Sequence, residues 1–158
     1  MRIERIAKGT IDNITIADVK AFANITGTTR DEELNAMLIS AINKVEDISG
    51  FSLTENTFRL YTEGSVASVK LFYPPFLSIT SVKDARTGEA VTYESNYDFS
   101  VIYVTSSDLV VEYKTSATCS NALQFKQNVI EYCSLLFDGQ TDEAIINSVL
   151  RKIPRSIC

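Results

Sequence analysis

The sequence predicts an α+β fold in which two helices at each end of the chain pack on a small antiparallel sheet of about five or six strands. Apolar residues recur at helical period near both ends, over residues 15–50 and 120–153. Between them, from Phe51 to Lys114, the period changes to two, and β-branched and aromatic residues become dense. Strands clustered between terminal helices are typical of the α+β class.

The length of 158 residues fits one domain, which we expect over residues 14–153. No internal repeat or low-complexity linker divides this range. Residues 1–13 are expected to be an N-terminal extension, either an added arm or a mobile segment. Residues 154–158 are expected to be a C-terminal tail.

Local signals mark the two N-terminal helices. Thr15 is a candidate N-cap, with Asp18 three residues on, so a short helix is expected to begin there. Thr29 and Glu32 have the spacing of a capping box for a second, longer helix, which Gly50 is expected to end. The predicted core stripe of this second helix is Leu34, Met37, Leu38, Ala41, Val45 and Ile48.

Two isoleucines of the second helix, Ile39 and Ile42, lie beside the core stripe. They make the apolar arc wider than one neighbouring element needs. Two interpretations stay open. Either a sheet and a second helix both cover the arc, or it contacts another copy of the protein.

The strand region predicts two hairpins and a bend. The first hairpin rises through 77–82, turns at "DARTGE" and returns through 91–93, and the second turns about 106–108. Pro74 and Pro75 have no N–H for a strand ladder. They are therefore expected to redirect the chain between two pairings.

Two more helices are expected after the strands. The first covers about 120–137, with Ser120 as N-cap and Gly139 after its end. The last begins at Thr141–Glu143, ends with Arg151 and Lys152, and is stopped by Pro154. This order of charges suits the helix dipole at both ends.

The formal net charge of −5 and the pI of about 4.8 argue against a sequence-reading nucleic-acid binder, which presents a basic patch. No apolar run approaches the roughly 18 residues of a membrane span. The charged N-terminus does not fit a signal peptide, so export is not expected. The widely spaced Cys119, Cys133 and Cys158 form no CxxC pair and are expected to be reduced thiols of a cytosolic protein.

No catalytic, cofactor or metal site is predicted. The chain has no histidine, which removes the commonest general base and metal ligand. Phosphate-binding, nucleophile-elbow and zinc-protease motifs are absent from the sequence. Acidic pairs such as Asp31 with Glu32 stand in the first turn of a helix, where they suit its dipole. Cys119 precedes a predicted helix start, but it has no histidine partner to make it a nucleophile.

The order of these motifs resembles the head-tail connector (adaptor) proteins of tailed phages, including the small connector of phage HK97 and its counterpart in phage SPP1. The likeness covers roughly residues 14–155. The chain departs from the family pattern over 115–121, where the family often has "YTAGY" and a proline. The matching positions are Lys20 in the short helix, the acidic start Asp31 to Glu33, Gly50, Pro74 and Pro75 followed by "SITSV", and Tyr113.

The resemblance implies a structural virion protein rather than an enzyme. Such proteins are assembled in the host cytoplasm into a ring, usually twelvefold, beneath the portal of the filled capsid. The implied partners are other copies of the chain, the portal protein, and the next connector or tail protein. Duplex DNA is expected to pass through the ring without sequence-specific binding, helped by acidic residues that repel phosphate. No cofactor and no membrane is implied.

A closed ring needs two different faces on each subunit. The candidates for this subunit interface are Ile39, Ile42, Arg86, Thr87 and Glu89. By the same resemblance, the C-terminal helix and tail are expected to dock on the portal; a mildly basic, solvent-exposed helix end is the simpler interpretation of this segment. The candidate docking residues are Ile146, Leu150, Arg151, Lys152, Ile153 and Arg155.

Two other functions stay open at this stage. A tail-completion or stopper protein binds an adaptor instead of the portal. A small-ligand or carbohydrate-binding domain needs a concave apolar pocket with convergent polar groups.

Overall fold

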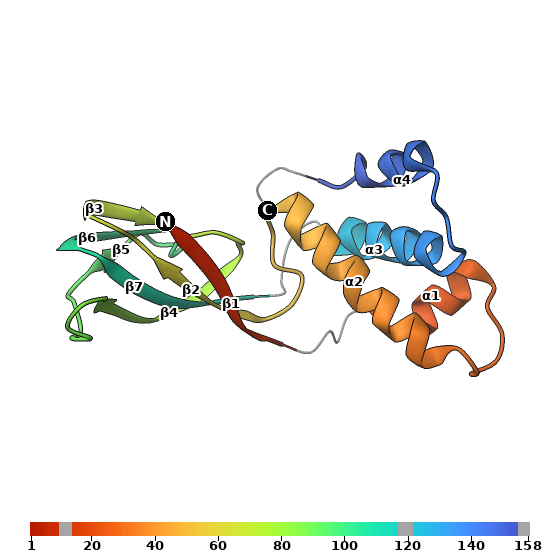
Figure 1. The fold of residues 1–158 in the computed structure, drawn as a ribbon, viewed down its shortest axis with the longest axis horizontal. Coiled ribbons are helices and arrows are strands. Elements are labelled where there is room, and N and C mark those ends of the chain that lie inside the picture. Colours follow the sequence, from red (N-terminus) through yellow and green to blue (C-terminus); the bar gives the residue numbers. More distant parts are fainter. Residues whose placement is uncertain (10–13, 117–121, 155–158) are drawn as a thin grey trace. The chain divides into compact units, whose positions relative to one another are not determined.

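A computed structural model describes residues 1–9, 14–116 and 122–154 of the chain. These residues form four helices and two antiparallel sheets, which confirms the predicted α+β class (Figure 1). The chain divides into two compact units: a sheet unit, residues 1–10 and 54–118, and a helical unit, residues 11–53 and 119–158. Each unit is built from two stretches of sequence, and the expected domain over 14–153 stays a prediction.

The helical unit contains all four helices. Their bounds are α1 Ile16–Ala23, α2 Asp31–Ser49, α3 Ala122–Phe137 and α4 Glu143–Leu150. Helix α3 packs against each of the other three helices. The expected N-cap of α3, Ser120, lies outside the described residues.

The predicted N-cap of α1 is confirmed, whereas that of α2 is wrong. At α1, the predicted cap is confirmed as a full capping box, because the Thr15 N–H donates to Asp18 Oδ2 at 2.8 Å and the Asp18 N–H donates to Thr15 Oγ1 at 3.4 Å. At α2, the predicted box of Thr29 and Glu32 is wrong, since the N-cap residue is Arg30 and, among the described residues, no side chain caps this helix. The left-handed Gly50, with φ of 72°, ends α2 as predicted.

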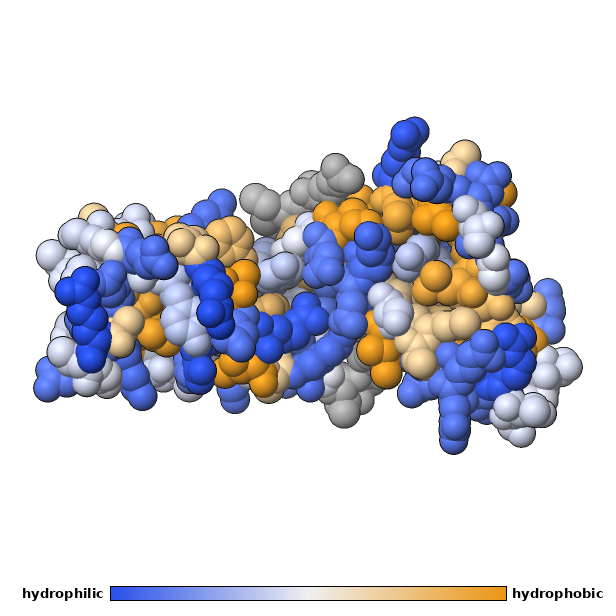
Figure 2. Space-filling model, in the orientation of Figure 1, coloured by the Kyte–Doolittle hydropathy of each residue, from blue (hydrophilic) through white to orange (hydrophobic). Residues whose placement is uncertain are grey.

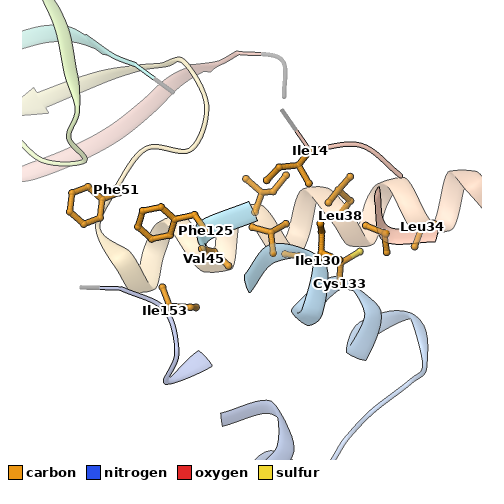
Figure 3. Close-up of a cluster of buried hydrophobic side chains, with 13 residues drawn as sticks. Ile14, Leu34, Leu38, Val45, Phe51, Phe125, Ile130, Cys133 and Ile153 are labelled. Atoms are coloured by element: carbon orange, nitrogen blue, oxygen red, sulfur yellow. The ribbon is translucent and has the colours of Figure 1, made fainter. Parts of the chain in front are cut away.

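Helices α1, α2 and α3 bury one hydrophobic cluster, drawn in Figure 3. Four members of the predicted α2 stripe are fully buried, and Met37 and Ile48 pack against them at the margin. Phe51, just after α2, meets Phe125 of α3 with ring centroids 5.7 Å apart. The buried stripe residues are Leu34, Leu38, Ala41 and Val45.

The sheet unit contains seven strands in two sheets. One sheet has the order β1-β2-β7-β4 and the other β3-β6-β5. The bounds are β1 Arg2–Lys8, β2 Asn56–Tyr61, β3 Ser65–Lys70, β4 Phe76–Asp84, β5 Glu94–Ser95, β6 Val101–Ser107 and β7 Leu109–Thr115. Residues 2–8, expected as an arm or a mobile segment, thus form an edge strand paired with β2.

Side chains from both sheets bury a second hydrophobic cluster. Leu60 and Val111 come from the first sheet, and Val69 and Ile102 from the second. Each unit therefore buries a hydrophobic cluster of its own. The sequence had predicted one core between the helices and a single small sheet.

The two predicted hairpins have different outcomes: the second is wrong in its pairing, and the first forms only next to its turn. Strands β6 and β7 lie in different sheets, because the chain crosses between them at Asp108, which has a left-handed φ of 53°. At the "DARTGE" turn, the Asp84 N–H donates to the Glu89 carbonyl and the Val91 N–H to the Val82 carbonyl, both at 2.9 Å, on either side of a bridge between Lys83 and Ala90. Along its length, β4 pairs with β7. Pairings between distant strands are not encoded in a two-residue period, which is why the sequence pattern misassigned them.

The prolines do what the sequence predicted. Pro74 and Pro75 lie between β3 of one sheet and β4 of the other, so they redirect the chain between two pairings. Next to them, the buried Tyr113 of β7 donates its hydroxyl proton to the Phe72 carbonyl at 3.0 Å and accepts from the Phe72 N–H at 3.3 Å. This contact ties the chain that leaves β3 to the first sheet.

Candidate assembly surfaces

The two isoleucines proposed as interface residues have different environments. Ile42 is completely buried in the helical cluster, so its side chain has no surface to offer a second copy. Ile39 is 42% exposed on α2. The wide apolar arc of α2 is thus partly filled within the helical unit, and of the two isoleucines only Ile39 is exposed.

The turn after β4 carries the other predicted interface residues. Arg86, Thr87 and Glu89 are all exposed. Asp84 Oδ1 accepts the backbone N–H groups of Arg86 at 2.8 Å and Thr87 at 2.9 Å, and these bonds hold the pKa of the Asp84 carboxyl below its usual value. The Arg86 guanidinium pairs with Asp108 at the crossing between the two sheets. The turn is therefore anchored at both its base and its tip.

The predicted docking residues form a mixed surface on α4 and the chain after it. Ile146 and Leu150 are half-buried, Arg151 and Lys152 are exposed, and Ile153 is buried in the helical cluster. Ile153 therefore anchors this segment instead of presenting a contact surface. Arg155 lies outside the described residues.

One contact caps the start of α4, and another ties the chain after its end to α3. Asp142 caps its start, with the Ala144 N–H donating to Asp142 Oδ1 at 2.8 Å. After its end, Lys152 Nζ donates to Glu131 Oε2 of α3 at 3.2 Å. Ile145, the first residue of the segment expected to dock on the portal, is 41% exposed. Figure 2 shows hydrophobic residues gathered beside α4 on the face it draws.

Two further features were missed at the sequence level. One is a pocket at the connection from α1 to α2, closed by Phe137 from the end of α3. The other is Tyr97, a fully exposed tyrosine on a turn between β5 and β6. The pocket joins residues more than 100 positions apart, so no local pattern signals it. Tyr97 lies between the two predicted hairpins, in a stretch to which the sequence pattern assigned no element.

The described residues offer little for chemistry. Across 1–9, 14–116 and 122–154, no group of three or more cysteine, aspartate or glutamate residues is placed to hold a metal ion. Cys133 is buried in the helical cluster, and burial raises the pKa of its thiol to about 11. Such a thiol stays protonated and unreactive at neutral pH. In the same ranges, no helix has the length and apolar character needed to cross a bilayer.

Charge is distributed unevenly between the units. By sequence, the helical unit contains seven basic and eleven acidic residues, whereas the sheet unit contains eight and nine. Most of the net charge of −5 therefore belongs to the helical unit.

No protein-family model matches the chain, and no curated protein matches it in sequence. Its fold, however, matches chains in solved structures of gene transfer agent (GTA) particles. The neck of an empty GTA particle computed with C6 symmetry contains a chain that matches with a TM-score of 0.75, and a chain in the virion of the native GTA particle matches with 0.72. A chain in the neck of the native particle computed with C12 symmetry matches with 0.71.

All three matches cover 100% of this chain and 97% of the other, at 14% sequence identity. At that identity the likeness establishes a shared fold over the whole chain. Both units are included in it.

Proposed function

We propose that this chain is a structural protein of the head-tail neck of a phage-like particle. The observation that carries the proposal is the end-to-end fold match, with a TM-score of 0.75, to a chain in the neck of a GTA particle. The order of motifs in the sequence points to the same class of protein independently. The narrower relationship to the connectors of phages HK97 and SPP1 stays a prediction.

The proposed form is a closed ring of twelve copies under the portal. The C6 and C12 symmetry of the matching necks supports a ring. A cyclic ring uses one heterologous contact, repeated at every subunit boundary. Ile39 on α2 and the anchored turn with Arg86, Thr87 and Glu89 are proposed to contribute to that contact.

We assign portal docking to α4 and the tail after it. The half-buried Ile146 and Leu150 offer apolar area, and the exposed Arg151 and Lys152 add positive charge to an otherwise acidic unit. An apolar patch with a charged rim is the usual anatomy of a protein interface. Arg155, in the tail, is retained in this proposed surface on sequence grounds.

The ring would extend the channel through which duplex DNA passes and would present its other face to the next connector or to the tail. An acidic wall repels phosphate, so DNA slides without binding. The role is one of shape and contact in the virion, after assembly in the host cytoplasm, and it requires no catalysis or cofactor.

The test is to mix the purified chain with portal-bearing, DNA-filled capsids and then to sediment and image them. We expect the chain to sediment with the capsids and to appear as a ring at the portal vertex. Capsids without a portal are the control. Equal binding to both kinds of capsid, or no binding to either, contradicts the proposal.

A truncation after Ile153 separates an adaptor from a stopper. An adaptor lacking residues 154–158 should keep its fold and lose portal binding, whereas a stopper should keep binding to its adaptor. Arg151→Glu probes the same surface by charge reversal, and Lys114→Glu, at an exposed position of the sheet unit, is the matched control. We expect only Arg151→Glu to weaken cosedimentation.

A further inference from the structure

A small pocket lies where α1 connects to α2. Its volume is about 130 Å³. Leu34, labelled in Figure 3, is buried and belongs to its floor, together with the partly buried Ile25 and Phe137. Thr29 and Arg30 are exposed and form its rim, so the pocket opens to solvent.

The pocket is held open by contacts of its own walls. Lys20 Nζ donates to the Gly27 carbonyl at 2.8 Å and pairs with Asp31, which fixes the connection between the helices. The guanidinium of Arg30 lies 4.1 Å from the centroid of the Phe137 ring, and its Nε donates to Glu33 Oε2 at 2.6 Å. The pocket therefore exists before anything binds in it.

The size and lining of the pocket select a single aromatic side chain. Pockets for cofactors and drug-sized ligands have volumes of roughly 300–1,000 Å³. An apolar protein cavity of about 150 Å³, in contrast, accommodates one benzene ring. Leu34, Ile25 and Phe137 supply apolar contacts for such a ring, and the Arg30 guanidinium supplies a cation at the rim. The oxygens of Thr29 and Asp31 can accept a bond from a phenol hydroxyl.

Tyr97, in the sheet unit, is such a side chain. It is 102% exposed, so it makes no packing contact within its own chain. It occupies a tight turn in which the Phe99 N–H donates to the Asn96 carbonyl at 3.1 Å. The side chains of Asn96, Asp98 and Ser100 bond to one another and to the backbone of the same turn. The backbone that carries the Tyr97 side chain is therefore held in one conformation, and less conformational entropy is lost when this side chain binds in a pocket.

We propose that Tyr97 of one copy inserts into the α1–α2 pocket of a neighbouring copy. The inference rests on the ring proposed above. A projecting side chain and a pocket on two different units of the chain make a heterologous contact, the kind of contact that a cyclic ring repeats at every subunit boundary. A buried tyrosine in a fitted pocket is also a common energetic anchor of protein interfaces.

The direct test is crosslinking between two variants. Tyr97→Cys and Thr29→Cys are made in separate chains, each with Cys119→Ser and Cys158→Ser, and are mixed under mild oxidation. We expect a disulfide between the two chains, identified by mass spectrometry of the linked peptides. Tyr103→Cys mixed with Thr29→Cys is the matched control, because Tyr103 is another exposed tyrosine, at 52%. Equal yields from the two mixtures overturn the proposal.

A second readout uses ring formation on portal-bearing capsids. Tyr97→Ala should weaken assembly of the subunit ring by roughly tenfold or more. Tyr97→Phe should retain most of the assembly, because its phenyl group still fills the pocket. Tyr103→Ala is expected to assemble normally.

The outcomes separate the two proposals. Normal rings from Tyr97→Ala overturn the Tyr97 contact and leave the neck function intact. If the unchanged chain forms no ring, the neck function fails, and the crosslinking yields still decide whether Tyr97 meets the pocket.

Discussion

The sheet unit and the helical unit organise the same chain in opposite ways. In the helical unit, the start of α1 is set by residues close in sequence, Thr15 and Asp18, and the end of α2 by Gly50. In the sheet unit, every strand of the larger sheet finds its partner across the chain, and β1 pairs with a strand about 50 residues away. Local signals thus define the helices, whereas long-range pairing defines the sheets.

The surfaces of the units differ as well. The helical unit has most of the net negative charge, the α1–α2 pocket and the amphipathic α4. The sheet unit is nearly neutral and presents two anchored turns, at 84–90 and 96–99. From this difference we infer that the exposed turns of the sheet unit contact the pocket and helical surface of a neighbouring copy.

Truncation of Phe125 should have the largest effect. Phe125→Ala removes a buried ring that packs on Phe51, and we expect a loss of about 3–5 kcal/mol in the free energy of unfolding. Hydrogen exchange should accelerate in α1, α2 and α3 more than in the strands, because the two hydrophobic clusters are separate. Leu60→Ala is the matched change in the sheet unit and should show the reverse pattern. Uniform acceleration in both variants would mean that the two units unfold as one.

Removal of the Tyr113 hydroxyl should have a moderate effect confined to the sheet unit. Tyr113→Phe deletes both bonds to Phe72 and leaves the Phe72 groups without this partner, at a cost of about 1–2 kcal/mol. Urea denaturation gives the change in stability. Tyr103→Phe, at an exposed position, is the control and should be close to neutral. A loss as large for Tyr103→Phe would show that the buried hydroxyl has no special role.

The α1 cap should contribute a smaller, pH-dependent stabilisation of the helical unit. The Thr15 N–H, and then Lys126, hold the pKa of the Asp18 carboxyl below its usual value near 4. A lowered folded-state pKa stabilises the fold at neutral pH, and this contribution is lost as the pH falls below about 4 toward the folded-state pKa. Asp18→Asn should cost about 1 kcal/mol at pH 7.

Urea titrations should show that the difference in the free energy of unfolding between Asp18→Asn and the unchanged chain becomes smaller as the pH is lowered from 5 to 2. Asp84→Asn is the matched change in the sheet unit and should show the same pH dependence, since backbone N–H bonds also lower the pKa of Asp84. A constant gap for Asp18→Asn across this range would rule out the carboxylate as the source of the stabilisation.

The smallest perturbation is thiol labelling of Cys133, which reports opening of the helical unit alone. With Cys119→Ser and Cys158→Ser in place, Cys133 is the remaining thiol. Because its pKa is raised to about 11 by burial, labelling at pH 8 should be slow in the folded chain and fast in urea. Phe125→Ala should accelerate it and Leu60→Ala should not. Fast labelling of the unchanged folded chain would contradict the burial of this thiol.

The contrast between local signals and long-range pairing explains which features could be predicted from sequence. The start of α1, the end of α2 at Gly50 and the role of the two prolines follow from local chemistry, and all three are confirmed. The start of α2 was placed one residue early, because Arg30 bonds Glu33 and lies on Phe137, a residue distant in sequence.

The strand pairings needed tertiary information. The chain from β6 to β7 reads as a hairpin, yet Asp108 carries it from one sheet into the other. The candidate surfaces were affected in the same way. Ile42 and Ile39 have the same residue type and neighbouring positions, but packing against other helices buries only Ile42.

The proposed neck function is tested most directly by a cryo-electron microscopy reconstruction of portal-bearing particles incubated with the purified chain. We expect a closed ring of density below the portal, in which each subunit fits both the sheet unit and the helical unit. Particles whose portal vertex stays bare, or chains bound singly without a repeating contact, would contradict it.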